Sequence, residues 1–287
     1  MVLAPRAERP IDPITLAVLR EIQNASVALG LEAFLVGATA RIILLEHVFG
    51  LQAERATRDI DFAFAVENWD QFKAIKRYLV TGTGFQEMER VMQRLLYQPE
   101  GCRRKFVVDL IPFGGLEVEK NTIAWPPDMS ILMNVAGYRD ALVSAVPVEV
   151  EPRLIVSVAS VAGIAILKLF AWVDRGREDP KDAIDLLTLL RRYHEAGNQD
   201  RIYEDASTVL ESVDYDIELS GAWLLGRDVA TISSPETRNE LGQLLNDTKL
   251  TDRLITDMSR AIRVHDDALE YAKVLLEQFS KGFTASE

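Results

Sequence analysis

Thr57-Arg58-Asp59-Ile60-Asp61-Phe62-Ala63 begins a segment in which acidic and alanine positions alternate with large apolar ones as far as Val66. This period-2 pattern predicts a strand over residues 59–66 with one apolar face. Because residues i and i+2 of a strand point to the same face about 6.6 Å apart, Asp59 and Asp61 project together. Two carboxylates in this arrangement repel each other unless a cation compensates them. The alternative explanation is a solvated strand edge.

A glycine turn lies upstream of this strand. The short apolar run 33–36 is followed by Gly37-Ala38-Thr39 and by a predicted helix over residues 39–49. Backbone N–H groups and the positive end of the helix dipole can receive phosphate groups at such a turn. A single glycine before a helix is also a common turn, so its significance depends on its proximity to Asp59.

A third carboxylate, Asp109, lies in a strongly apolar predicted strand, residues 105–111. Burying a charge costs several kcal/mol unless it is paired or binds a metal. On a strand next to the Asp59/Asp61 strand, Asp109 would complete a site for hard cations such as Mg²⁺, which prefer oxygen ligands. The alternative is a buried ion pair with an arginine, for which the candidates are Arg103, Arg58 and Arg41.

The remaining pattern predicts two domains. Helices are expected at 13–30 and 68–79, strands at 85–89, 93–98, 141–150 and 154–158, and an irregular stretch around Gly114-Gly115 and Pro126-Pro127. From residue 160 onward only helical patterns appear. The predicted class is therefore α+β, with a mixed sheet flanked by helices in residues 1–158 and an all-helical domain in residues 159–287.

Composition bounds the function. The net charge of −12 disfavours indiscriminate binding to polyanions, so a nucleic-acid substrate would need a local basic patch. Residues 103–105 and the Lys73/Lys76/Arg77 cluster are candidates, with a solvated surface as the alternative. The single cysteine, Cys102, excludes a disulfide framework and a CxxC metal site, which fits a reducing compartment such as the cytoplasm. No signal peptide or membrane-spanning segment is expected.

The helical half contains a second group of charged residues. Lys168 lies on an otherwise apolar helical stripe, with Arg175 on the same face. Two explanations stay open for Lys168. Either its aliphatic stem extends along the apolar surface so that the ammonium group reaches solvent, or the ammonium group contacts a phosphate. Asp182 and Asp185 share a face of the next predicted helix. They could pair with neighbouring cations on that helix or with Lys168 itself.

Five segments together resemble the DNA polymerase beta-like nucleotidyltransferase superfamily and, more narrowly, the bacterial predicted nucleotidyltransferases of the AbiEii/AbiGii toxin family. They are Phe34-Leu35-Val36-Gly37-Ala38-Thr39-Ala40-Arg41, Arg55-Ala56-Thr57-Arg58-Asp59-Ile60-Asp61-Phe62-Ala63, Val108-Asp109-Leu110-Ile111-Pro112-Phe113-Gly114, Leu167-Lys168-Leu169-Phe170-Ala171-Trp172 with Asp174-Arg175, and Lys181-Asp182-Ala183-Ile184-Asp185-Leu186-Leu187. The resemblance implies a nucleotidyltransferase fold followed by helices. It also implies transfer of a nucleotide from an NTP, with Mg²⁺ or Mn²⁺ as cofactor and release of pyrophosphate.

The resemblance also implies roles for individual residues. Asp59, Asp61 and Asp109 would be catalytic metal ligands, and Gly37, Ala38 and Thr39 would receive the phosphates. Lys168 would contact the nucleotide phosphates, supported by Asp185 and less directly by Asp182.

The sequence departs from the superfamily pattern at Ala38, where serine or glycine is usual. A contact from a serine hydroxyl to phosphate is therefore missing. Two functions stay open. The chain is either an active transferase or a catalytically weak nucleotide-binding or interaction protein, such as half of a toxin–antitoxin-like pair with an antitoxin partner. Three mutually repelling aspartates favour the enzyme. Its acceptor could be RNA such as tRNA, a protein, or a small molecule such as an aminoglycoside.

Overall fold

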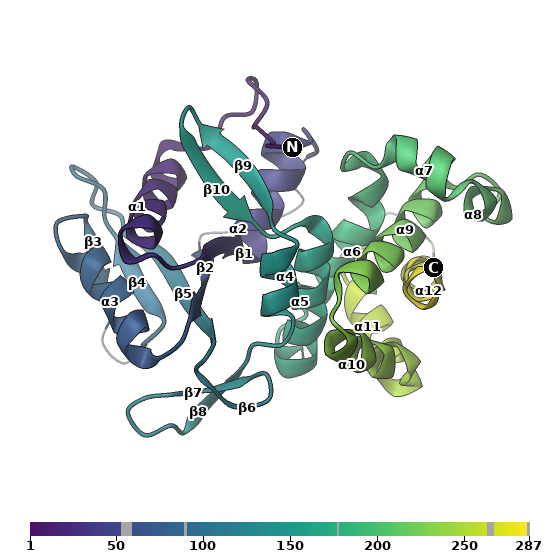
Figure 1. Ribbon diagram of the computed structural model, residues 1–287. Helices are drawn as coiled ribbons and strands as arrows, with labels where there is room; N and C mark the ends of the chain where they lie inside the picture. Colours follow the sequence, from purple (N-terminus) through teal and green to yellow (C-terminus); the bar gives the residue numbers. More distant parts are fainter. Residues whose placement is uncertain (53–58, 89–90, 177, 263–266, 286–287) are drawn as a thin grey trace. The chain divides into compact units, whose positions relative to one another are not determined.

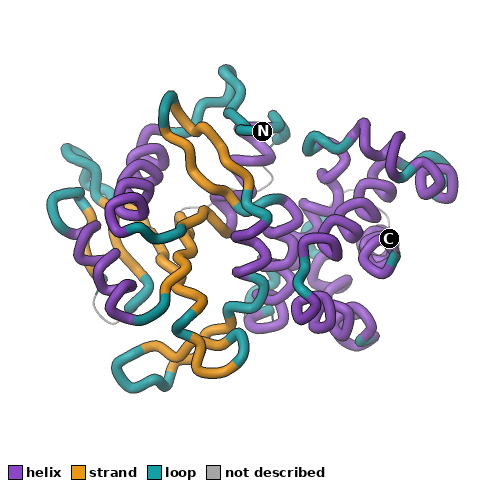
Figure 2. Tube along the Cα trace, viewed as in Figure 1, coloured by secondary structure: helices purple, strands orange, loops and turns teal. Residues whose placement is uncertain are grey.

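The computed structural model describes residues 1–52, 59–88, 91–176, 178–262 and 267–285. The chain divides into two compact units, Met1–Ser160 and Val161–Glu287. Strands occur in the first unit, whereas the regular structure of the second, over its described residues, is helical (Figure 1, Figure 2). The predicted class, a mixed sheet with helices followed by a helical C-terminal region, is confirmed. The assignment of separate roles to the two units stays a prediction.

The core of the first unit is a seven-stranded mixed sheet with the strand order β3-β4-β5-β2-β1-β10-β9. The strands are β1 (Ala33–Val36), β2 (Asp59–Val66), β3 (Phe85–Glu87), β4 (Arg94–Tyr97), β5 (Phe106–Gly114), β9 (Val146–Glu151) and β10 (Leu154–Val158). The pairs β2/β5 and β1/β10 are parallel, and the other neighbouring pairs are antiparallel. The predicted alternation along β2 is confirmed, because Ile60, Phe62 and Phe64 are fully buried on one face while Asp59 and Asp61 are half-buried on the other.

Local sequence signals account for the helices that pack against each other beside this sheet, α1 (Pro13–Leu29) and α3 (Trp69–Val80). The Asp12 side chain accepts hydrogen bonds from two backbone N–H groups at the start of α1, and Gly30 ends the helix with a φ of 64°. Asn68 caps α3 in the same manner. The helix expected after Gly37 is α2 (Gly37–Ile42), which continues as a π-helical segment, η1 (Ile43–Val48).

Two predictions for the first unit were wrong. The stretch expected to be irregular forms a three-stranded antiparallel sheet of β6 (Glu117–Glu119), β7 (Thr122–Trp125) and β8 (Ile131–Asn134). These strands are too short to give a periodic signal, and tertiary packing of Trp125 against Trp69 and Phe72 of α3 anchors them. The strand expected from Ala141 is preceded by helix α4 (Tyr138–Val143), and β9 begins only at Val146.

The second unit consists of helices α5 to α12 with a short 3₁₀ segment, η2. Their bounds are α5 (Val161–Arg175), α6 (Lys181–Arg192), η2 (Tyr193–Glu195), α7 (Gln199–Asp205), α8 (Ser207–Ser212), α9 (Ile217–Ile232), α10 (Pro235–Asn246), α11 (Thr248–Ser259) and α12 (Ala268–Thr284). Helices α9 and α12 approach most closely at Gly226 and Gly282. A Cβ atom on Gly282 would lie 1.9 Å from the Trp223 carbonyl oxygen, so this crossing depends on glycine.

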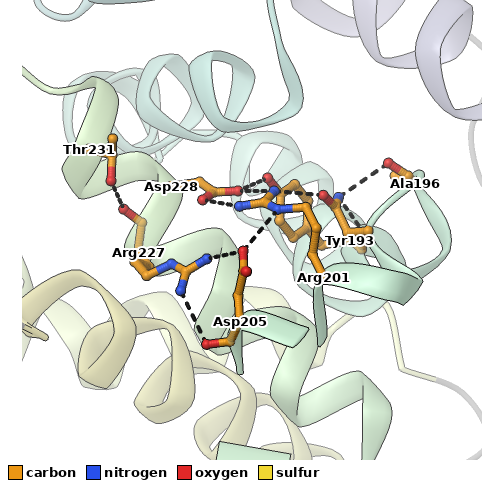
Figure 3. A network of polar contacts seen from close by, with 8 residues as sticks. Tyr193, Ala196, Arg201, Asp205, Arg227, Asp228 and Thr231 are labelled. Atoms are coloured by element: carbon orange, nitrogen blue, oxygen red, sulfur yellow. Dashed lines mark hydrogen bonds and ion pairs between the residues drawn. The ribbon is translucent and has the colours of Figure 1, made fainter. Parts of the chain in front are cut away.

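A polar network holds η2, α7 and α9 together (Figure 3). Arg201 donates to both oxygens of Asp228 at 2.7 and 2.8 Å, and the Tyr193 hydroxyl donates to the same carboxylate. Arg227 extends the network to Asp205, with a nitrogen–oxygen distance of 2.9 Å. Burial, followed by the neighbouring Asp228 charge, raises the pKa of Tyr193, so this hydroxyl stays protonated and acts as a donor. The described helices include none that is long and apolar enough to cross a membrane.

Candidate active site

One row of paired residues crosses four strands of the large sheet. Val36 of β1 is the partner of Asp61 of β2, Asp61 is the partner of Asp109 of β5, and Asp109 is the partner of Arg94 of β4. Side chains of directly paired residues share a face, so the parallel register of β2 and β5 brings Asp61 and Asp109 side by side. Asp59 lies two residues before Asp61 on that face. The expectation that the Asp109 strand lies next to the Asp59/Asp61 strand is therefore confirmed.

The Gly37 turn lies directly against Asp61. Gly37 has a φ of 68°, and a Cβ atom built on it would lie 2.2 Å from the Asp61 Oδ2 atom. Glycine is needed here both for the backbone conformation and for the room it leaves to the carboxylate. The Thr39 hydroxyl donates to the Asp59 carbonyl oxygen at 2.9 Å, which ties the start of α2 to the start of β2. The turn and the two aspartates thus form one structural group, with Ala38 half-buried between Gly37 and Thr39.

Asp109 is held by an arginine that the sequence reading did not single out. Arg94 donates from Nε to Oδ1 at 2.8 Å and from Nη2 to Oδ2 at 2.7 Å. An ion pair for Asp109 is confirmed, but the expected partners Arg103 and Arg41 were wrong, and Arg58 lies outside the described residues. The hydrogen bond to Asp109, together with the charges of Asp109, Asp59 and Asp61, raises the pKa of Arg94 against the opposing effect of burial.

Sequence reasoning missed Arg94 because nothing local marks it. It begins a four-residue strand, and its role depends on the antiparallel register that sets it opposite Asp109. A register is fixed by tertiary pairing, so the only available signal was a cation near the start of the predicted strand 93–98.

The chemistry of the donor set suits a hard divalent cation, because Asp59, Asp61 and Asp109 offer carboxylate oxygens on one face of the sheet. However, the described residues contain no group of three carboxylate, histidine or cysteine side chains already arranged as a metal site. The metal-ligand role of the three aspartates stays a prediction.

In the second unit, the structure brings Lys168, Asp182 and Asp185 together. The buried Lys168 Nζ atom lies 2.9 Å from Asp182 Oδ1 and 2.5 Å from Asp185 Oδ2. Arg175 adds hydrogen bonds from Nε to Asp182 Oδ2 at 2.7 Å and from Nη2 to Oδ1 at 3.2 Å. Of the alternative partners considered for the two aspartates, Lys168 is the one observed, whereas the phosphate contact of Lys168 stays a prediction.

Asp182 is fully buried, with 0% of its side chain exposed. Burial alone would raise the pKa of this carboxyl, but hydrogen bonds from Arg175 and Lys168 and the charges of both cations outweigh it and lower the pKa. Asp182 is therefore ionised and binds both cations, joining α5 to the start of α6.

Neighbouring side chains contact several cations of the two candidate basic patches. Lys76 is buried, with its Nζ atom 3.7 Å from a Glu87 oxygen, and Lys73 pairs with Asp70. In the other patch Lys105 donates to Gln86 and the Arg104 guanidinium lies over the Phe106 ring. An open depression in the surface lies beside this second patch, lined by Gly84, Gln86, Gln98 and Arg103 among others, and it contains none of the three aspartates. These patches do not by themselves identify an acceptor.

A family model described as nucleotidyl transferase AbiEii toxin, type IV toxin–antitoxin system, matches residues 19–272 of the sequence. The chain belongs to this family. The match includes all nine predicted site residues, from Gly37 to Asp185, and confirms the family resemblance inferred from the five motifs. No curated protein matches the sequence.

Solved structures give more distant likenesses. The antibiotic-resistance factor ANT(2'')-Ia is 17% identical, with a TM-score of 0.36 over 70% of this chain and 97% of its own. The Thermotoga maritima CCA-adding enzyme complexed with tRNA is 12% identical, with a TM-score of 0.26 over 97% of this chain and 80% of its own. A CCA-adding enzyme in complex with ATP is 15% identical, with a TM-score of 0.25 over 93% and 67% of the two chains. The assignment rests on the AbiEii family match, to which these scores add nothing.

Proposed function

We propose that this protein is a nucleotidyltransferase that moves an NMP from an NTP to an acceptor hydroxyl and releases pyrophosphate. One observation carries the proposal: the parallel register of β2 and β5 sets Asp61 opposite Asp109 while the Gly37 turn lies against the Asp61 carboxylate. Carboxylates for a cation and a glycine turn for phosphates are thereby neighbours. Membership of the AbiEii family supports the same reaction class.

In this proposal Asp59, Asp61 and Asp109 hold Mg²⁺ or Mn²⁺. When bound, such cations neutralise charge on the triphosphate and lower the pKa of the acceptor hydroxyl. Backbone N–H groups of the turn formed by Gly37, Ala38 and Thr39 receive phosphate oxygens. The Lys168 ammonium group, oriented by the Asp182 and Asp185 carboxylates, is the proposed additional phosphate contact.

The chemical step is an in-line substitution at the α-phosphorus. The acceptor oxygen forms a bond to this phosphorus, and the bond from the phosphorus to the oxygen bridging to the β-phosphate breaks. Pyrophosphate leaves with the electron pair, and the hydroxyl proton passes to water. The contribution of the protein is mainly to position the reactants and to stabilise developing charge.

The alternative is a nucleotide-binding or interaction protein without turnover, favoured by Ala38, which lacks the usual hydroxyl. Calorimetry with each NTP tests whether the site binds a nucleotide together with a metal, and the labelling experiment described below tests turnover. Metal-dependent NTP binding in the presence of Mg²⁺ or Mn²⁺ supports the transferase. The absence of binding at millimolar concentrations would contradict it.

The acceptor is the second part of the proposal. We infer an acceptor in the cytoplasm, with tRNA, a protein and a small molecule as candidates, and an antitoxin-like protein as the partner that the family description suggests. The test is incubation of the protein with labelled NTPs and a bacterial extract, followed by identification of the species that acquires label. Labelled RNA, protein or small molecule identifies the acceptor class, and no label in any fraction contradicts transfer.

A further inference from the structure

The Arg94–Asp109 ion pair lies within the proposed metal site. Both donor nitrogens of Arg94 point to the two oxygens of Asp109, at 2.8 and 2.7 Å. This planar, two-point geometry is the strongest form of arginine–carboxylate contact. The pair occupies the end of the row that begins at Val36 and passes through Asp61.

The Asp109 carboxylate would have to bind both the Arg94 guanidinium and the proposed cation. The proposed function needs Asp109 as an oxygen ligand, but the Arg94 guanidinium already neutralises its charge and engages both oxygens. A divalent cation on the same carboxylate would be repelled by the adjacent guanidinium, because like charges a few ångströms apart interact strongly in a partly buried site. In the observed geometry the guanidinium therefore weakens the binding of a divalent cation to Asp109.

The Arg94 side chain has room to move away from Asp109. It is 32% exposed, compared with 15% for Asp109, and Arg94 is the first residue of the short strand β4. The guanidinium can thus rotate toward solvent without opening the sheet, while Asp109 stays fixed by its pairing on both sides.

We propose that Arg94 competes with the divalent cation for Asp109, so that the Arg94 ion pair weakens metal ligation by this carboxylate. This inference rests on the proposed function, since it assumes that the cation binds among Asp59, Asp61 and Asp109. Without metal, Arg94 stabilises the row by offsetting the repulsion among the carboxylates. The metal affinity of the protein is consequently lower than its three carboxylates would give.

The test is Mn²⁺ binding by the full chain without nucleotide, followed by the electron paramagnetic resonance signal of free Mn²⁺. Arg94→Gln removes the competing charge and is expected to bind Mn²⁺ at least tenfold more tightly than wild type. In an Asp109→Asn background, the Arg94→Gln change is expected to raise the affinity by a much smaller factor, because only the longer-range effect of the Arg94 charge on Asp59 and Asp61 remains. Arg20→Gln is the matched control, because it removes an arginine–carboxylate pair with Glu151 elsewhere in the same unit, and it should bind as wild type does.

A folded Arg94→Gln protein that binds Mn²⁺ no more tightly than wild type would overturn the inference alone. If neither wild type nor Arg94→Gln binds Mn²⁺ at millimolar concentrations, both the inference and the metal-dependent part of the proposed function are contradicted. Should Arg94→Gln be less stable, its melting temperature must rise more on addition of Mn²⁺ than that of wild type does. An equal rise also overturns the inference.

Discussion

Asp61 lies between the Gly37 turn on one side and Asp109 on the other, so its carboxylate is the central group of the proposed site. Asp61→Ala is expected to reduce nucleotide transfer at least about 100-fold, since even partners outside a metal's first shell commonly change activity 10–100-fold. Its melting temperature should stay near or above that of wild type, because the change relieves repulsion among carboxylates.

Labelled-NTP transfer and thermal unfolding measure the two effects of this substitution separately. Asp70→Ala removes an exposed carboxylate from α3 in the same unit and serves as the control. Full transfer activity in Asp61→Ala would contradict the assignment of the site.

At the scale of elements, the junction of α5 and α6 is set by Asp182, a buried carboxylate between Lys168 and Arg175. Its pKa is lowered from 3.8 in the folded protein, so its contribution to stability is present above that value and is lost as the pH falls through the lower folded-state pKa. Asp182→Asn is expected to lower the free energy of unfolding by about 3 kcal/mol at pH 7, since it removes one of the two carboxylates that pair with the buried Lys168 ammonium group.

The deficit of Asp182→Asn should shrink as the pH falls below 3.8. Urea unfolding at a series of pH values measures this dependence. Asp252→Asn changes an exposed carboxylate on α11 of the same unit and should give no comparable deficit. A deficit for Asp182→Asn that is the same at low and neutral pH would argue against the ionised state assigned to this residue.

The crossing of α9 and α12 provides a second prediction for this unit. A Cβ atom on Gly282 would meet the Trp223 carbonyl oxygen at 1.9 Å, so Gly282→Ala is expected to cost about 2 kcal/mol or more through overpacking. Gly242 of α10 has its nearest neighbour at 3.9 Å, and Gly242→Ala should instead stabilise the protein by about 0.5–1 kcal/mol through helix propensity. Chemical denaturation compares the two, and equal effects would contradict the close helix contact.

The elements differ in how well sequence predicted them. The β2 strand could be predicted because its acidic and apolar positions alternate, and Asn68 and Asp12 marked their helices because capping is a local signal. The β6–β8 sheet was not, because three- and four-residue strands carry no period and depend on contacts of Trp125. At the site, motifs predicted Asp61 and Asp109 as neighbours, but the Arg94 pair required a register that no local pattern encodes.

At the scale of the whole molecule, each of the two units has its own buried core, which predicts independent folding. A fragment of residues 161–287 should show a helical circular dichroism spectrum and a single cooperative thermal transition. The fragment of residues 1–160 is the companion sample and should retain the mixed sheet. A C-terminal fragment that melts without cooperativity would contradict the two-domain organisation.

The row from Val36 to Arg94 also has a consequence for biosynthesis. Asp61 leaves the ribosome long before Asp109, and β1 meets its parallel partner only when Val158 has been made. Domains generally fold as units, and long-range strand pairing is slow to form because the intervening chain must first be closed into a loop. A growing chain therefore carries separate, unassembled aspartates, and the proposed site assembles only after the last strands of the first unit have been synthesised.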